Sequence, residues 1–452
     1  MTHSLPNWIC ALVCIALWLA LVGWTVMKVR RENRAARERA AALGQSAATT
    51  VLVAYASQTG TAEDMAWKTA ASLSEAGTPA RPVSLAELDE ATLKAAQRIL
   101  FIVATTGEGD APDNASGFLR RQMTHKIDLG HLNYAVLALG DSSYERYCAF
   151  GKQLDDWLAE GGAHALYPRI DVDNGNADSL NLWQQQLADL AGADSLSVWT
   201  PQAFEPWQLV RKVHLNPGSA GGEAWHLVFQ PVDHAPQWEA GDIAEFALPA
   251  AEGETPQTRE YSLASIPADD AAEFCVRLMT GPDGTPGLGS GWLIRSLKEG
   301  DVVDMRIRPN RSFRPAPSEA PILLIGNGTG IAGLRAHLKV ARKGQAWLLF
   351  GERNRAHDNF FGDELKALQA AGMLARVDHA WSRDEGDGRY VQHLISENAR
   401  DIERWIDRGA YIFVCGSLEG MSKGVHAALE TVLGEERLQG LTDAGRYRRD
   451  VY

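Results

Sequence analysis

The sequence has few cysteines and no excess of basic residues. Its 452 residues include 5 cysteines, and no two of them stand as Cys-x-x-Cys. Such scattered cysteines argue against a disulfide framework, an iron–sulfur cluster or a zinc site, and no metal site is predicted. The 44 basic residues are outnumbered by 57 acidic ones, which gives a net charge of -13. Nucleic-acid binding needs a basic face, so this class of partner is not expected.

Low-complexity tracts and internal repeats are also missing. Hydrophobic residues make up 45% of the chain and charged residues 22%, as in globular proteins. The length suits about three domains of about 150 residues each.

Charged residues are absent from the first 27 positions, where residues 8–27 form a mostly apolar run. A helix of about 20 residues spans about 30 Å, the thickness of a bilayer core. Six basic and two acidic residues follow within residues 28–39. Because the positive charge follows the run, the pattern favours an anchor over a secretory signal, with the N-terminus outside and the catalytic domains in the cytoplasm. A buried core helix is the alternative reading.

These observations predict a single-pass protein of the inner membrane. A transmembrane helix would occupy residues 1–28 and contact lipid through residues 8–27. A basic, Ala-rich linker would follow over residues 29–50.

Residues 51–197 alternate between short apolar runs and helical stretches. The runs at 51–55, 98–105 and 134–140 each lead into a loop rich in Gly, Ser or Asp. This alternation predicts an α/β domain with a doubly wound parallel sheet, in which ligands bind beyond the carboxyl ends of the strands.

The pattern changes after this region. Residues 203–315 hold short alternating segments broken by Pro and Gly, which predicts an antiparallel β-barrel. The α/β rhythm returns over residues 320–452 and predicts a second doubly wound domain.

Three polar loops follow the strands of residues 51–197. The first joins a strand to a helix, where hydroxyls and backbone N–H groups suit a phosphate dianion; without a lysine or the Walker spacing, a monophosphate is favoured. An ordinary helix cap is the alternative for this loop alone. Glycines in the other loops allow close approach to a flat ring, on which Tyr144 can stack. The candidate residues are Ser57, Gln58, Thr59, Gly60, Thr61, Ala62, Ala104, Thr105, Thr106, Gly107, Leu139, Gly140, Asp141, Tyr144 and Cys148.

This set of loops resembles the FMN-binding loops of flavodoxins and is similar in detail to the NADPH-dependent diflavin reductases, above all to the sulfite reductase flavoprotein branch. The resemblance covers residues 50–452 and implies that the loops bind FMN with Asp173 close to it. Thr106 departs from the family, because many members have an aromatic ring at that position. One face of the flavin is therefore expected to be less covered.

A second set of motifs resembles the FAD site of ferredoxin-reductase-type barrels. The resemblance implies that Arg259 pairs with the FAD diphosphate, that Tyr261 stacks on the flavin and that Ser262 lies near flavin N5. Arginine offers a fixed fork to phosphate, and tyrosine an amphipathic plane. The implied FAD-binding residues are Arg259, Glu260, Tyr261, Ser262, Gly287, Leu288, Gly289, Ser290 and Tyr452.

A glycine loop at residues 326–330 joins an apolar strand to a helix and suits a phosphate group. Ser382 and Arg383 follow a later strand and can clamp a 2′-phosphate, which selects NADP over NAD; a solvated arginine is the alternative. Gly388 stands where the family has a lysine, and Arg389 is expected to replace it. The resemblance implies that NADP is bound by Gly328, Thr329, Gly330, Ser382, Arg383, Arg389, Tyr390, Gln392 and Cys415.

The last residues also match the family, in which a terminal aromatic ring covers the flavin. The resemblance implies that Ser262, Cys415 and Asp450 line the hydride-transfer site and that Tyr452 gates it. Ser417 stands where the family usually has an aspartate. A frayed tail is the alternative.

The expected activity is electron transfer from NADPH through FAD and FMN to an acceptor. Only residues 249–258 stand where larger relatives insert a connecting domain, so this domain is expected to be absent. The acceptor is expected to be a haem protein, like the sulfite reductase haemoprotein, or a membrane redox partner. A reductase of small oxidants such as ferric chelates or quinones, or a non-catalytic scaffold, are the alternatives.

Charge is unevenly distributed along the chain. Residues 51–197 carry 10 basic and 20 acidic residues, so a large share of the acidity falls on the expected FMN domain. A basic docking face on the acceptor is therefore predicted, since complementary charge speeds transient encounters.

Overall fold

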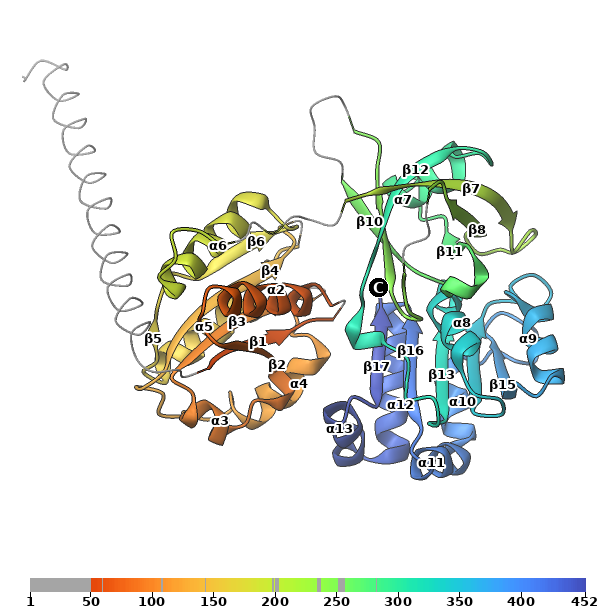
Figure 1. Cartoon of the computed structure of the whole chain (residues 1–452). Helices are drawn as coiled ribbons and strands as arrows, with labels where there is room; N and C mark the ends of the chain where they lie inside the picture. The colour runs from red at the N-terminus through yellow and green to blue at the C-terminus, as the bar shows by residue number, and fades with distance from the viewer. Residues whose placement is uncertain are drawn as a thin grey trace, which may run out of the picture. The chain divides into compact units, whose positions relative to one another are not determined.

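The computed structural model describes residues 50–452, except 59, 107–108, 143, 197–198, 200–202, 234–236, 251–256 and 282. The chain forms two compact units (Figure 1). The first extends to Trp199, without the loop 58–61, and the second begins at Thr200.

The predicted membrane location requires a correction. Over the described part of the chain, no helix is both long enough and apolar enough to cross a bilayer. The predicted anchor (1–28) and all of the predicted linker (29–50) but Thr50 lie outside the described residues. The prediction of a single-pass protein of the inner membrane is therefore wrong. The predicted lipid contact and membrane redox partner are withdrawn with it.

The first unit is a parallel sheet with helices on both faces (Figure 1). Its strands are β1 (Val51–Ala56), β2 (Ala80–Ser84), β3 (Arg98–Ala104), β4 (Asn133–Gly140), β5 (His164–Ala165) and β6 (Ile170–Asp173). Its helices are α2 (Thr61–Glu75), α3 (Glu90–Ala95), α4 (Asp113–Arg121), α5 (Ala149–Glu160) and α6 (Ala177–Ala191). The strand order is β2-β1-β3-β4-β5, with β6 also beside β4.

Alternate residues of each central strand face two different cores. In β1, Leu52 and Ala54 join the core that includes α3, α4 and α5, whereas Val51 and Val53 join the core that includes α2 and α6. A strand buried on both faces needs a continuous apolar sequence, which explains the uninterrupted runs. Because the paired strands are parallel, the loops after β1, β3 and β4 emerge at one edge of the sheet.

The second unit begins with an antiparallel sheet of order β10-β9-β12-β7-β8-β11. Its strands are β7 (Glu205–His214), β8 (Ala224–Pro231), β9 (Ile243–Ala247), β10 (Thr258–Ser262), β11 (Ala272–Arg277) and β12 (Val302–Arg308), with the short helix α7 (Leu288–Gly291). Within the described residues no ladder joins the edge strands β10 and β11. The predicted antiparallel β-barrel is therefore not confirmed, although the antiparallel pairing is present.

The unit ends with a parallel sheet of order β15-β14-β13-β16-β17, as predicted for a doubly wound domain. The strands are β13 (Ile322–Asn327), β14 (Ala346–Glu352), β15 (Leu374–Trp381), β16 (Tyr411–Gly416) and β17 (Tyr447–Val451). The helices are α8 (Ile331–Val340), α9 (Gly362–Ala370), α10 (Val391–Glu397), α11 (Ala399–Asp407), α12 (Lys423–Leu433) and α13 (Glu435–Asp443). One core packs against α8 and α9, and the other against α10 to α13.

Buried charges join the two sheets of the second unit. Arg335 of α8 donates to Glu273 of β11 at 2.7 Å, to Glu364 of α9 at 2.9 Å and to the carbonyl of Ala264 at 3.0 Å. His226 of β8 also lies 2.7 Å from the Glu273 carboxylate. Burial raises the pKa of Glu273, but the hydrogen bond from His226 and the charge of Arg335 outweigh it and hold the pKa at about 2. The network therefore depends on Glu273 being ionised.

Replacement of Arg335 by alanine is expected to destabilise the second unit by about 3 kcal/mol, because Glu273 would remain as a buried charge without its main partner. Urea unfolding of the Arg335→Ala variant measures this loss. The control Arg342→Ala removes a 58%-exposed arginine of an ion pair and is expected to cost less than about 0.5 kcal/mol.

The same variant tests the pH dependence. The pKa of Glu273 is about 2 in the folded chain and 4.5 without the fold, so the ionic contribution is complete above the higher value and disappears as pH falls towards the lower one. The acid-induced loss of stability over this window should be smaller in Arg335→Ala. An unchanged acid dependence would contradict the role of the network.

Candidate functional site

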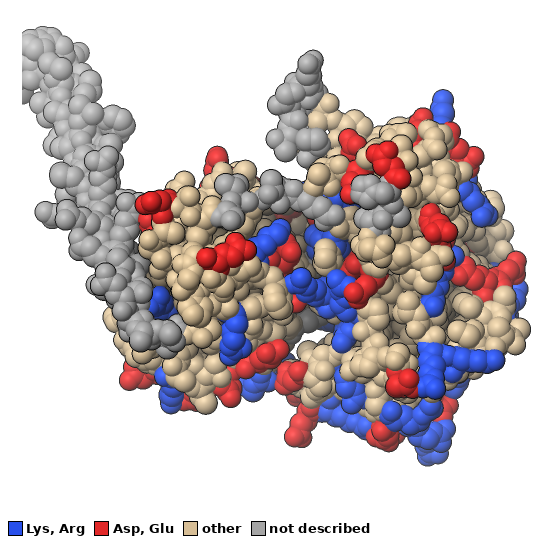
Figure 2. Space-filling view, in the orientation of Figure 1, with Lys and Arg blue, Asp and Glu red and all other residues tan. Residues whose placement is uncertain are grey.

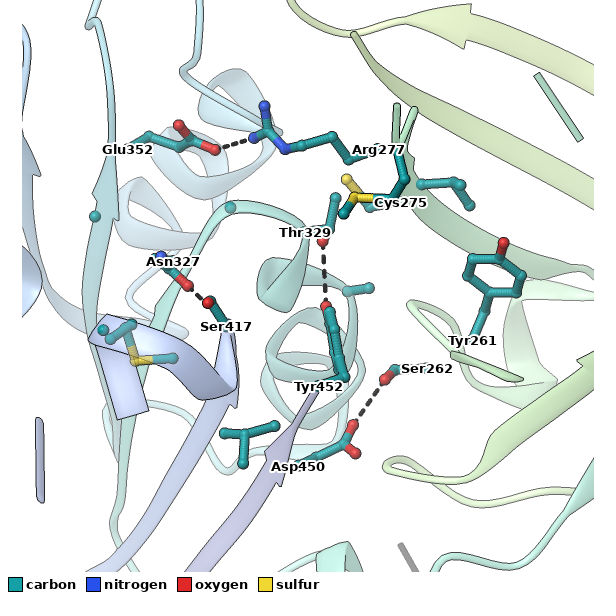
Figure 3. A pocket seen from close by; sticks show the side chains of 18 of the residues that line it. Tyr261, Ser262, Cys275, Arg277, Asn327, Thr329, Glu352, Ser417, Asp450 and Tyr452 are labelled. Carbon is teal, nitrogen blue, oxygen red and sulfur yellow. Dashed lines mark hydrogen bonds and ion pairs between the residues drawn. The ribbon is translucent and has the colours of Figure 1, made fainter. Parts of the chain in front are cut away.

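A pocket of about 1030 Å³ lies between the two sheets of the second unit. It is lined by β10, by the segment 287–290, by the glycine loop after β13, by the residues after β14, β15 and β16, and by the C-terminus (Figure 3). Small-molecule sites typically have about 300–1,000 Å³. The pocket is therefore large enough for a dinucleotide.

The segment 287–290 packs directly on β10. A Cβ atom at Gly289 would lie 2.6 Å from Arg259 Cγ and 3.0 Å from Tyr261 Oη, so a side chain there would displace both residues. Burial raises the pKa of Tyr261 to about 12, and its phenol stays protonated. Ser290 Oγ accepts a hydrogen bond of 3.0 Å from the amide of Met279 and fixes the segment.

The predicted FAD-binding residues thus line one wall of the pocket. Arg259 is exposed and donates to the carbonyl of Thr258 at 2.8 Å, within its own strand. Leu288 is 57% exposed. The Glu260 carboxylate accepts a hydrogen bond of 2.8 Å from Arg308. These side chains could hold the diphosphate and ring of a flavin dinucleotide.

Ser262, Cys415 and Asp450 come together from β10, β16 and β17. Ser262 Oγ donates to Asp450 Oδ2 at 2.7 Å (Figure 3). Cys415 Sγ lies 3.7 Å from the same oxygen. Asp450 is buried, and burial raises the pKa of its carboxyl group, while the Ser262 hydrogen bond opposes this shift. The phenol of Tyr452 lies 3.2 Å from Thr329 Oγ1 at the pocket surface.

The glycine loop between β13 and α8 lies against β16. A Cβ atom at Gly330 would stand 2.1 Å from the carbonyl oxygen of Cys415, so only glycine allows this approach. Asn327 Oδ1 accepts a hydrogen bond of 3.1 Å from the amide of Ser417, which ties the loop to the end of β16. Because the loop opens the helix α8, its backbone N–H groups suit a phosphate.

The predicted 2′-phosphate residues, Ser382 and Arg383, follow β15 directly and lie beside the end of β14. Ser382 donates from its amide and from Oγ to the carbonyl of Glu352, at 2.8 and 3.2 Å. Arg383 is exposed, and Tyr390 and Gln392 also line the pocket. Arg389 also lines the pocket, where Asp387 and Glu397 hold its guanidinium at 2.5 and 2.7 Å, so its replacement of the family lysine stays a prediction.

Three charged residues that line the pocket were not predicted from the sequence. Arg277 ends β11, and Glu352 and Arg353 stand at the end of β14. They belong to no recognised motif. Their position at the carboxyl end of an apolar run was the available signal for Glu352 and Arg353, since this is where parallel sheets bind ligands.

In the first unit, the loop after β1 forms a helix cap. Ser57 Oγ accepts a hydrogen bond of 3.2 Å from the amide of Ala62, and the Ser57 amide donates to Asn114 Oδ1 at 3.1 Å. Thr61 is the first residue of α2. Thr59 lies outside the described residues, as does Gly107 of the next loop. The N-terminus of this 15-residue helix is suited to a phosphate.

The loops after β3 and β4 hold each other in place. The amide of Thr105 donates to the Leu139 carbonyl at 2.9 Å, and Thr105 Oγ1 accepts from the amide of Phe150 at 3.3 Å. Thr106 closes a turn, with its amide 2.8 Å from the Asp110 carbonyl. Tyr144 is 45% exposed and free of the core, as a stacking ring would need.

Other predicted FMN residues serve the structure around these loops. Asp173 accepts hydrogen bonds from the Ser142 amide at 2.9 Å and from Ser142 Oγ at 2.5 Å. Cys148 is fully buried, with Sγ 3.4 Å from the Ala138 carbonyl. Leu139 and Ala104 pack on the core of the sheet, so only their backbone can face a ligand. Gln58, Gly60, Gly140 and Asp141 lie in the same loops.

Two domain families match the chain. Residues 53–183 match the family described as flavodoxin, and residues 324–427 match the oxidoreductase NAD-binding domain. This pair of domains defines a flavoprotein oxidoreductase and supports the predicted kinship with the diflavin reductases. The predicted enzyme class and its cofactors FMN, FAD and NADPH are confirmed by these matches together with the relatives described next.

The chain is similar to sulfite reductase (NADPH) flavoprotein alpha-components. The protein of Neisseria meningitidis serogroup C is 29% identical, with 89% of each chain covered. That of Aliivibrio fischeri is 25% identical, with 96% of this chain and 94% of the relative covered. The first alignment runs over 542 positions, more than the 452 residues present here, so the relative has residues without a counterpart.

We expect Ser262→Ala to slow reduction of the enzyme by NADPH at least about tenfold, because Asp450 loses its shorter hydrogen bond and keeps only the 3.7 Å contact with the Cys415 thiol among the described residues. Removal of a bond that favours the ionised carboxylate raises the pKa of Asp450 further, so the pH profile should shift to higher pH. Stopped-flow measurement of flavin bleaching gives both quantities. The control Ser296→Ala changes an exposed serine outside the pocket, and equal profiles for the two variants would refute the role of Ser262.

Proposed function

We propose that this protein passes electrons from NADPH through FAD and FMN to a haem protein. The observation that carries the proposal is the hydrogen bond between Ser262 and Asp450 at the wall of a dinucleotide-sized pocket that is also lined by the glycine loop, with Cys415 buried behind Asp450. When bound, the flavins and NADPH supply hydride and single-electron chemistry, and the protein supplies position and electrostatics.

The residues present suit these groups. FAD would be held by Arg259, Tyr261 and the segment 287–290, whose close packing forms the wall of the pocket. NADPH would be held by the glycine loop and by Ser382 and Arg383. FMN would be held by the loops after β1, β3 and β4, with its phosphate at the start of α2.

The chain's own groups would control the proton and solvent at the hydride site. Ser262 Oγ directs its proton to Asp450 Oδ2, and the raised pKa of Asp450 lets this carboxyl group take up a proton more readily than an exposed one. Tyr452 would exclude water from the pocket until the nicotinamide takes its place, since the residue is 56% exposed and its phenol is held by one contact, with Thr329, among the residues that the structure describes.

The acceptor is proposed from the relatives and from charge. The relatives are components of sulfite reductases, and the 20 acidic residues of residues 51–197 exceed the 10 basic ones. Figure 2 shows that, on the visible face of the first unit, the acidic side chains are spread among basic ones. A haem protein with a basic face would therefore be attracted by the net charge of the unit rather than by one patch.

The proposed electron route predicts that loss of FMN separates two activities. Ser57→Asp keeps an oxygen that can cap α2, but it places a negative charge where the FMN phosphate would bind. The purified variant should lose FMN and retain FAD, and its NADPH-dependent cytochrome c reduction should fall at least about tenfold while ferricyanide reduction persists. Flavin release and the two assays measure this.

Ser84→Asp is the matched control, since Ser84 Oγ also caps a short helix but outside the proposed site. It should retain both flavins and both activities. Retention of FMN and of cytochrome c reduction in Ser57→Asp would contradict the phosphate loop.

Tyr452→Ala is expected to lower the preference for NADPH over NADH, measured as the ratio of kcat/KM values, about tenfold. NADPH can use the binding energy of its 2′-phosphate to displace the ring, whereas NADH cannot, so removal of the ring helps NADH more. Tyr452→Phe keeps the ring and loses only the contact with Thr329, and its preference should stay close to that of the original protein. Equal preferences in all three proteins would exclude a gating role.

A further inference from the structure

An ion pair between Arg277 and Glu352 crosses the pocket at the glycine loop. Arg277 Nη2 donates to Glu352 Oε1, and the pair connects β11 of the antiparallel sheet with β14 of the parallel one (Figure 3). The side chains are 20% and 4% exposed. Neither the sequence motifs nor the proposed electron route uses this pair.

The pair lies against the backbone of the loop. A Cβ atom at Gly328 would stand 3.3 Å from Glu352 Oε1 and 3.7 Å from Arg277 Nη2. An anion held by the N–H groups of this loop would therefore meet the guanidinium and the carboxylate together. The guanidinium attracts such an anion and offers it a fixed fork, whereas the carboxylate repels it.

Each side chain has a further anchor besides the other. Arg277 Nη1 donates to the carbonyl of Gly222 at 2.8 Å, and its guanidinium lies 5.7 Å from the centre of the Phe360 ring. Glu352 Oε2 accepts from the amide of Arg353 at 2.8 Å. Arg277 would thus stay at the pocket wall if its contact with Glu352 were broken, with the Nη2 edge available to another anion.

We propose that Arg277 binds the diphosphate of the dinucleotide and that Glu352 is an internal anion that occupies Arg277 until the diphosphate displaces it. The inference rests on the proposed function, in which NADPH binds in this pocket. Binding exchanges one anionic partner of Arg277 for another, so Glu352 sets the affinity for the nucleotide below what the pocket could reach. Glu352 is a positioning residue that acts through Arg277.

Removal of the Glu352 charge is therefore expected to strengthen binding. In the full-length holoenzyme, Glu352→Gln should lower the Kd for NADP⁺ about tenfold and that for inorganic pyrophosphate by a similar factor. Adenosine 2′-monophosphate has no diphosphate, and its Kd should stay within about twofold. Isothermal titration calorimetry measures all three ligands. The matched control Glu223→Gln removes a carboxylate that pairs with Arg295 at 2.6 Å outside the pocket and should change none of them.

A double-variant cycle tests whether Glu352 acts through Arg277. Arg277→Gln should weaken NADP⁺ and pyrophosphate binding about tenfold, and adding Glu352→Gln to it should give no gain. A gain that persists without Arg277 would show direct repulsion and overturn the proposal, as would an unchanged affinity in Glu352→Gln alone.

Two further measurements keep the test decisive. If Glu352→Gln fails to fold, Glu352→Asp withdraws the carboxylate by one methylene, and about threefold tighter pyrophosphate binding is expected from it. If the original protein binds pyrophosphate but not NADP⁺, the proposed function fails while the pyrophosphate titrations still decide the roles of Arg277 and Glu352.

Discussion

The buried contact between Arg335 and Glu273 is the interaction on which the second unit depends most. It joins a strand of the antiparallel sheet to the first helix of the parallel sheet, and His226 and Glu364 complete its hydrogen bonding. A buried charge without a partner is costly, so the two sheets can meet only in the arrangement that satisfies all of these groups. The pocket between the sheets inherits its shape from that arrangement.

The same arrangement explains how distant residues of the chain share one site. Ser262 stands near the middle of the chain and Asp450 almost at its end, yet their side chains lie 2.7 Å apart. The residues come from the edge strand of one sheet and from the last strand of the other. Burial then gives the Asp450 carboxyl group a raised pKa that neither strand would produce alone.

Much of the architecture could be predicted because it depends on short-range pattern. Continuous apolar runs such as 51–56 and 98–104 indicate strands buried on both faces, and glycine loops at their carboxyl ends indicate phosphate sites. The antiparallel β-barrel predicted for residues 203–315 is not confirmed. Whether the edge strands β10 and β11 pair depends on long-range geometry, which a local sequence pattern does not contain. The predicted membrane anchor rested on an apolar run and on the charges that follow it. No helix of the described residues supports the membrane location inferred from them.

The sequence alone determined the order of the α/β and antiparallel regions and the loops that can approach a phosphate, since these follow from residue type and local spacing. Only the tertiary structure decided the partners of charged groups. It brought Arg277 to Glu352 beside the glycine loop, although 75 positions separate the two residues. Ion pairs form between residues far apart in the sequence, and folding, not local pattern, brings such residues within reach.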